Sequence, residues 1–112
     1  MGAAAAAVSE RAVSAATRRL VRRLRAEYHV DRVLLFGSRA RGDALATSDV
    51  DLLVVSPDFA GMAWRERILA VCRLWTGPVA LEPFCYTPGE FQRRSGQLTL
   101  VREAARTGVR LA

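Results

Sequence analysis

The sequence contains no lysine and no asparagine, and its only isoleucine is Ile68. All 17 basic residues are therefore arginines, a bias that a GC-rich coding sequence would produce whatever the function. Against 11 acidic residues they give a formal net charge of +6. Such an excess is typical of proteins that bind nucleic acid. Because the arginine content has this simpler explanation, we favour an ordinary solvated surface over a nucleic-acid site.

Long apolar runs and closely spaced cysteines are also missing. No run reaches the roughly 18 apolar residues needed to cross a bilayer, and Cys72 and Cys85 lack the spacing of a metal knuckle or a redox pair, which predicts two core thiols. The alanine-rich start has no preceding basic region, and Ala6 stands where a myristoylation signal requires Ser or Thr. We therefore expect a cytoplasmic protein without membrane contact.

The chain length limits the organisation to one domain. With 112 residues, of which 51% are hydrophobic, the chain can form a single packed core. No linker, repeat or low-complexity insertion divides it. We expect one domain over residues 1–112, with a flexible start over residues 1–9.

Apolar spacing predicts alternating helices and strands. One helix would carry an apolar stripe at Val13, Leu20, Val21, Leu24 and Tyr28. Strands are expected over 33–36, 50–55 and 79–86, a second helix over 63–75 with Trp64 and Trp75 in the core, and one or two helices at the end. Pro83 favours an edge position for the third strand, and Thr87 to Glu90 is a capping box that starts a helix.

Two aspartates at the start of the second strand are the first candidate for chemistry. Side chains on a strand alternate between faces, so Asp49 and Asp51 should share one face while Val50 and Leu52 enter the core. Two nearby carboxylates repel each other and require a proton or a cation. Oxygen ligands of this kind suit Mg²⁺ or Mn²⁺ completed by water and substrate phosphates.

A phosphate-binding corner is predicted at the end of the first strand. Gly37 permits a sharp turn and close approach of a ligand to the backbone, and Ser38 adds a hydroxyl donor. Arg39 and Arg41 could supply positive charge to a polyphosphate. A glycine-serine pair alone would be an ordinary turn, so the prediction depends on its combination with the aspartates.

Together these motifs resemble a known family. The segment Leu35-Phe36-Gly37-Ser38-Arg39-Ala40-Arg41-Gly42, followed by Ser48-Asp49-Val50-Asp51-Leu52, is similar to the signature of the minimal nucleotidyltransferases, which are related to DNA polymerase beta. The similarity extends from about Leu20 to the end of the chain. It implies an α+β nucleotidyltransferase fold, with a small mixed sheet of about three to four strands flanked by helices.

The resemblance also implies roles for individual residues. Asp49 and Asp51 would be catalytic and would bind two Mg²⁺ or Mn²⁺ ions, while Gly37, Ser38, Arg39 and Arg41 would bind the nucleoside triphosphate, expected to be ATP. Active members use a third carboxylate on a later strand, and Glu82 is the candidate for both catalysis and metal binding. The alternative is that Glu82 is merely an exposed residue of an edge strand.

Three functions remain open at this stage. The first is transfer of a nucleoside monophosphate, expected to be AMP, to a hydroxyl on a partner protein; the resemblance implies the antitoxin half of a pair with a HEPN-like toxin. The second is a non-catalytic module that neutralises a partner by forming a complex. The third and least favoured is nucleotidyl transfer to nucleic acid. Activity that depends on the partner, and a homo-oligomer, are further open alternatives.

Overall fold

The computed structural model describes residues 9–96 and 100–112. Its elements, in chain order, are α2 (Glu10–Glu27), β1 (Arg32–Phe36), α3 (Ser38–Arg41), β2 (Val50–Val55), the 3₁₀ helix η1 (Pro57–Phe59), α4 (Trp64–Cys72), β3 (Leu81–Tyr86), α5 (Pro88–Ser95), α6 (Leu100–Thr107) and β4 (Val109–Arg110).

A mixed four-stranded sheet forms the centre of the molecule, in the order β3-β2-β1-β4. Strand β1 is antiparallel to both β2 and β4, whereas β2 and β3 run parallel. The predicted α+β class with a small mixed sheet is therefore confirmed. The sequence did not predict β4, which has only two residues and follows α6 after Gly108.

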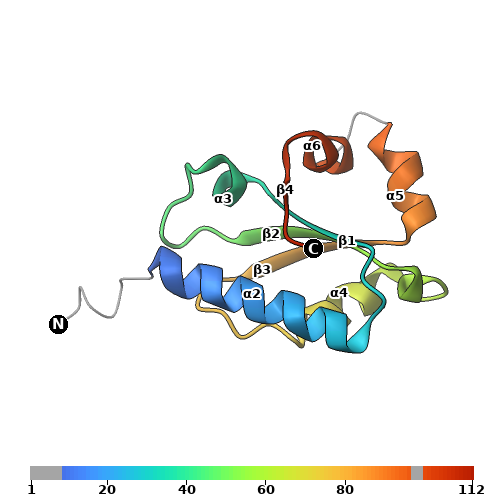
Figure 1. The fold of residues 1–112 in the computed structure, drawn as a ribbon, viewed down its shortest axis with the longest axis horizontal. Helices are drawn as coiled ribbons and strands as arrows, with labels where there is room; N and C mark the ends of the chain where they lie inside the picture. Colours follow the sequence, from blue (N-terminus) through green and yellow to red (C-terminus); the bar gives the residue numbers. More distant parts are fainter. Residues whose placement is uncertain (1–8, 97–99) are drawn as a thin grey trace.

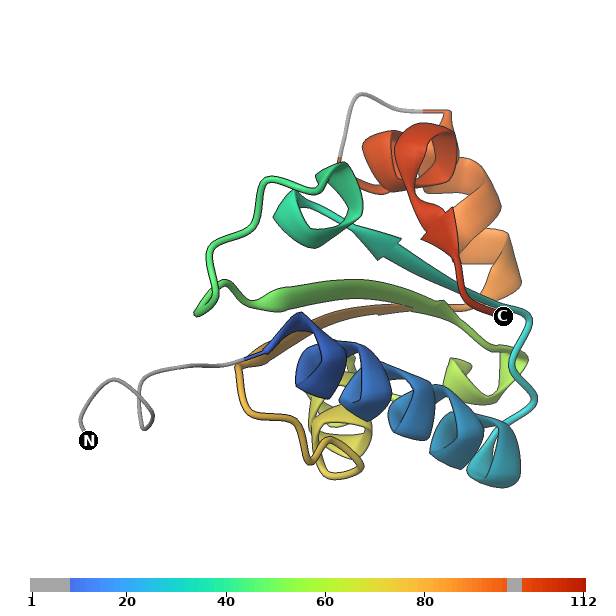
Figure 2. The same ribbon diagram turned by 60° about the vertical axis from the view of Figure 1, so that its left-hand side comes forward.

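Helices cover both faces of the sheet (Figure 1). Helices α2 and α4 lie on one side, and α5 and α6 lie on the other, as the turned view also shows (Figure 2). Alternation along β2 divides its side chains between two apolar clusters, with Val50, Leu52 and Val54 toward α2 and α4, and Leu53 and Val55 toward α5 and α6. Both clusters share the same strands.

Strand β3 and the start of the helix after it agree with two sequence predictions. Strand β3 lies at an edge of the sheet, where the missing N–H of Pro83 is tolerated. The side chain of Thr87 then accepts a hydrogen bond from the Glu90 N–H, and the Glu90 carboxylate accepts one from the Thr87 N–H. This reciprocal pair confirms the capping box at the start of α5.

The two tryptophans are less buried than the sequence predicted. Trp64 is 43% exposed and packs its ring 5.1 Å from that of Tyr86. Trp75 is half-buried, because α4 ends at Cys72 and the indole N–H instead donates to the Val79 carbonyl in the following loop. Placing Trp64 in the core was therefore wrong, whereas Trp75 packs against the core as a partly buried side chain. The cysteines are free thiols, Cys85 buried and Cys72 half-buried.

Of the predicted flexible start over residues 1–9, the structure describes only Ser9. Ser9 caps α2 by accepting a hydrogen bond from the Ala12 N–H, and residues 1–8 of the expected flexible start lie outside the described residues. In the part of the chain that is described, no helix is both long and apolar enough to span a membrane.

Candidate active site

The two aspartates lie where β2 begins. Asp49 immediately precedes the strand and is exposed, while Asp51 is its second residue and is half-buried. Val50 and Leu52, the residues on either side of Asp51, are fully buried on the opposite face. The predicted alternation therefore holds, and the Asp51 carboxyl faces the side of the sheet that α5 and α6 cover.

Glu82 stands directly beside Asp51. In the parallel pairing of β2 with β3, Asp51 is the register partner of Glu82. Burial, followed by the charge of Glu82, a hydrogen bond with Glu82 and the charge of Asp49, raises the pKa of Asp51 to about 6, although Arg41 acts in the opposite direction. Glu82 is an exposed residue of the edge strand, and it is also a close neighbour of Asp51. Its role in catalysis stays a prediction.

The turn after β1 brings the backbone against the same carboxylate. Phe36, the last residue of β1, is the register partner of Asp51, and Gly37 follows with a φ of 74°. That conformation favours glycine. In addition, a Cβ at this position would overlap the Asp51 carboxylate. Only glycine therefore permits both the turn and the close approach to Asp51.

The short helix α3 begins immediately after this turn. The Gly37 carbonyl accepts hydrogen bonds from the Ala40 and Arg41 N–H groups, which places Ser38 in the first turn. The N–H groups at the start of a helix have no partner within the helix. Gly37 lies against Asp51, and Ser38 follows it at the start of the helix. Phosphate binding at this corner stays a prediction.

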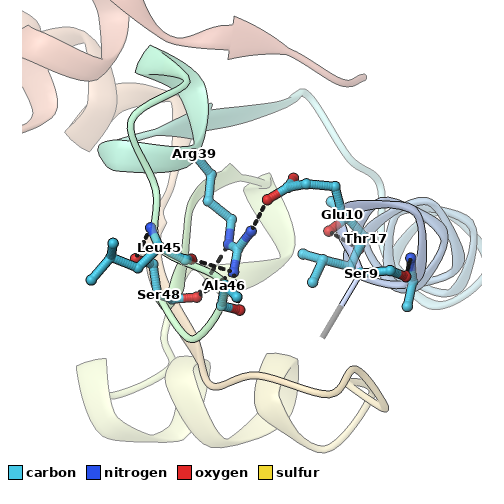
Figure 3. Close-up of polar contacts among 9 residues, drawn as sticks. Ser9, Glu10, Thr17, Arg39, Leu45, Ala46 and Ser48 are labelled. Atoms are coloured by element: carbon cyan, nitrogen blue, oxygen red, sulfur yellow. Dashed lines mark hydrogen bonds and ion pairs between the residues drawn. The ribbon is translucent and has the colours of Figure 1, made fainter. Parts of the chain in front are cut away.

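The two arginines of α3 differ in their surroundings. Arg41 is exposed, pairs with Asp43 at 3.3 Å and lies close enough to Asp51 to affect its pKa. The Arg39 side chain is only 5% exposed. Its guanidinium donates to backbone carbonyls of the loop before Asp49 and forms an ion pair with Glu10 at 2.9 Å (Figure 3). Contact of Arg39 with nucleotide stays a prediction.

Glu10 is a site neighbour that the sequence analysis did not identify. It lies in the first turn of α2, 29 positions before Arg39. An acidic residue there is an ordinary feature of a helix start, since it interacts well with the helix dipole. No sequence pattern connected it to the glycine-serine corner.

The carboxylates match the chemistry of a hard divalent cation. Among residues 9–96 and 100–112, no three His, Cys, Asp or Glu side chains are gathered closely enough to hold a metal ion on their own. Asp51 and Glu82 nevertheless repel each other beside the exposed Asp49. Mg²⁺ and Mn²⁺ take oxygen ligands, and Mg²⁺ commonly uses only one or two carboxylates plus water and phosphate oxygens. The residues therefore fit such an ion bound together with a phosphate group.

Comparison with known proteins agrees with this geometry. A nucleotidyltransferase domain family model matches residues 17–102. A crystal structure of a candidate nucleotidyltransferase from Sulfolobus solfataricus is 30% identical, with a TM-score of 0.61 and 72% of each chain covered. BolA1 from Arabidopsis thaliana aligns with a TM-score of 0.53 and 25% identity, over 67% of this chain and 93% of its own. No curated protein sequence matches significantly.

The family match includes both parts of the site, the turn at Gly37 and Ser38 and the carboxylates Asp49, Asp51 and Glu82. It also includes most of the sheet that brings them together. The chain therefore belongs to the nucleotidyltransferase domain family.

Proposed function

We propose that this protein transfers AMP from ATP to a hydroxyl group on a partner protein, using divalent cations and releasing pyrophosphate. The observation that carries the proposal is the position of Asp51. It is the register partner of Glu82, and its carboxylate also lies against the Gly37 backbone. Two carboxylates and a glycine turn at one point suit a metal-bound triphosphate.

Each residue has a defined task in this proposal. Asp49, Asp51 and Glu82 would hold the divalent ions, and bound ions would neutralise the triphosphate and favour ionisation of the attacking hydroxyl. The Gly37 backbone admits the phosphates beside Asp51, and the Ser38 hydroxyl donates to them. Glu82, which is exposed at the sheet edge, would accept the proton of the acceptor hydroxyl. Exposed Arg41 adds positive charge beside the carboxylates.

We favour an acceptor hydroxyl on another protein chain, as the resemblance to the minimal nucleotidyltransferases implies. By the resemblance noted above, a HEPN-like toxin is our leading candidate for that partner. The net charge of +6 would favour a partner with an acidic surface.

The direct test is adenylylation of the partner. Incubating the protein with a HEPN-like partner chain, Mg²⁺ and ATP should add one or more AMP units to the partner, detected by mass spectrometry. Labelled ATP offered with single-stranded RNA in place of the partner should leave the RNA unlabelled. Absence of a mass shift with the wild-type protein would contradict the proposal.

The double variant Asp49→Ala/Asp51→Ala separates catalysis from complex formation. If transfer is the function, this variant should leave the partner unmodified and should no longer suppress its toxicity. If it still protects cells, neutralisation by binding alone is the better account.

A further inference from the structure

We propose that Arg39 is a positioning residue, which fixes the loop in front of Asp49 instead of binding phosphate. The inference rests on the proposed function, since it assigns the loop a place in the same site. It concerns residues 43–48, which join α3 to Asp49 and β2.

The guanidinium of Arg39 binds this loop through several backbone carbonyls. Both Nε and Nη2 donate to the Ser48 carbonyl, at 3.1 and 2.7 Å, and Nη2 also donates to the Ala46 carbonyl at 3.2 Å. The Ser48 carbonyl belongs to the peptide that joins Ser48 to Asp49. Arg39 therefore holds the backbone at the point where Asp49 enters the site.

Among the described residues, the loop has few other bonds to the rest of the protein; at its start, the Asp43 N–H donates to the Ser38 carbonyl at 3.1 Å. The loop closes on itself through the Leu45 N–H and the Ser48 hydroxyl at 2.9 Å, and through the Ser48 N–H and the Leu45 carbonyl at 3.0 Å. Leu45 at its tip is 74% exposed and contributes little to any core. A loop with little buried apolar area opens easily, so the bonds from Arg39 should dominate its order.

Arg39 also connects the two halves of the site. It follows Ser38 in α3, so one end of the residue is fixed to the phosphate corner and the other to the approach to Asp49. With its side chain 5% exposed and its donors directed to carbonyls and Glu10, little of the guanidinium is available to a phosphate. Lysine could not replace it, because an ammonium group lacks the planar fork of donors.

A cavity that opens to solvent lies beside Arg39. Arg39 and Glu10 line this cavity of about 480 Å³ between α2 and the sheet, whose floor includes Val13, Val21 and Leu35. A small cation could enter this cavity in a variant that lacks the arginine side chain. Free guanidinium should therefore restore the loop in Arg39→Ala, which provides a specific test.

The experiment compares Arg39→Ala and Arg39→Lys with Arg25→Ala, a control at an exposed arginine of α2. Three readouts are needed: amide hydrogen exchange over residues 43–49, Mn²⁺ affinity by calorimetry, and nucleotidyl transfer with separate kcat and KM. Circular dichroism establishes that each variant is folded. Arg39→Lys keeps the positive charge and serves as the second variant if Arg39→Ala does not fold.

We expect both Arg39 variants to exchange these amides faster and to bind Mn²⁺ about tenfold more weakly, the effect typical of a residue that orients a metal ligand. Low millimolar guanidinium should reverse both changes in Arg39→Ala only, and kcat should fall more than KM rises. Unchanged exchange and Mn²⁺ affinity with a raised KM would overturn the inference in favour of phosphate binding. If the wild-type protein transfers nothing, the proposed function fails, while hydrogen exchange still decides whether Arg39 orders the loop.

Discussion

At the scale of single residues, Gly37 and Asp51 occupy adjoining space. The absent side chain of Gly37 is what allows the Asp51 carboxylate to approach the backbone turn. An ordinary turn requires glycine only because of its φ. Here the Asp51 carboxylate of the neighbouring strand also leaves no room for a side chain. This contact is a more specific reason for the glycine than the turn signal visible in the sequence.

Replacing Gly37 should therefore damage the site beyond the cost of the turn. Gly37→Ala should abolish nucleotidyl transfer and lower the free energy of unfolding by at least about 1–2 kcal/mol, from backbone strain. Gly61→Ala is the matched control, since Gly61 has a φ of 80° and open space around its Cβ position. Chemical denaturation and transfer assays would measure both. Full transfer activity in Gly37→Ala would contradict the overlap with Asp51.

Asp51 is predicted to reduce stability in the absence of metal. Its pKa is raised to about 6 from an ordinary 3.8, so the folded protein disfavours its ionised form. This cost is absent below the ordinary pKa of 3.8, grows as the pH rises from there to about 6, and is fully present above about 6. Asp51→Asn should therefore raise the metal-free free energy of unfolding by about 1 kcal/mol at pH 8 and by little at pH 4, after solvent screening is allowed for.

The same variant should lose Mn²⁺ binding and nucleotidyl transfer. Denaturation in the presence of a chelator at both pH values measures the stability effect, and calorimetry measures the metal. A variant that is less stable than the wild type at pH 8 would show that Asp51 has a net stabilising role.

At the scale of elements, Arg67 joins α4, β3 and α5. Its side chain is 8% exposed and donates to the Met62 and Cys85 carbonyls and, at 2.6 Å, to the Glu90 carboxylate. Glu90 thus closes the capping box of α5 and also neutralises a buried arginine from α4. These bonds hold the edge of the sheet that carries Glu82.

Acid titration should reveal how much the Arg67–Glu90 ion pair contributes to stability. The Arg67 guanidinium and the Thr87 N–H lower the pKa of Glu90 to about 2 from 4.5. The stability that Glu90 provides is therefore present above about pH 4.5 and lost as the pH falls toward 2. Glu90→Gln should cost about 1–2 kcal/mol at pH 7 and almost nothing near pH 2. Denaturant titrations across this range measure the difference, with Glu103→Gln as an exposed control. A cost that does not depend on pH would contradict the ion pair.

At the scale of the whole molecule, one sheet separates two apolar clusters. Leu53 and Val54 are neighbours in β2, yet Leu53 packs toward α5 and α6 while Val54 packs toward α2 and α4. A strand that contributes to both clusters links their stability. The two helical layers should therefore unfold together.

Truncations in the two clusters should have parallel effects. Leu53→Ala should lower the free energy of unfolding by about 2–4 kcal/mol and Val54→Ala by about 2 kcal/mol. Each variant should retain a single transition by circular dichroism and by tryptophan fluorescence, as two-state unfolding requires. Trp75 packs against the cluster on the α2 and α4 side, whereas the Trp64 ring packs on Tyr86 of the other cluster. A fluorescence transition that does not coincide with the loss of the helical signal would therefore indicate independent layers.

Much of the architecture follows from local patterns. Alternation in β2, the stripe of α2, the edge preference of Pro83 and the capping box at Thr87 depend on nearby residues, and each appears in the structure as predicted. Strand β4 was missed because two residues carry no periodicity. Trp64 was misplaced because apolar spacing does not tell which end of a helix extends past the core.

The sequence by itself determined the nucleotidyltransferase family and the α+β class and predicted the candidate site residues, because short motifs and apolar patterns carry this information. Only the tertiary structure decided that Asp51 faces Glu82 and Gly37, and that Arg39 turns toward the loop and Glu10. These contacts join residues far apart in the chain. Strand register and the direction of a side chain depend on how the whole sheet packs, and no local pattern of residues contains that information.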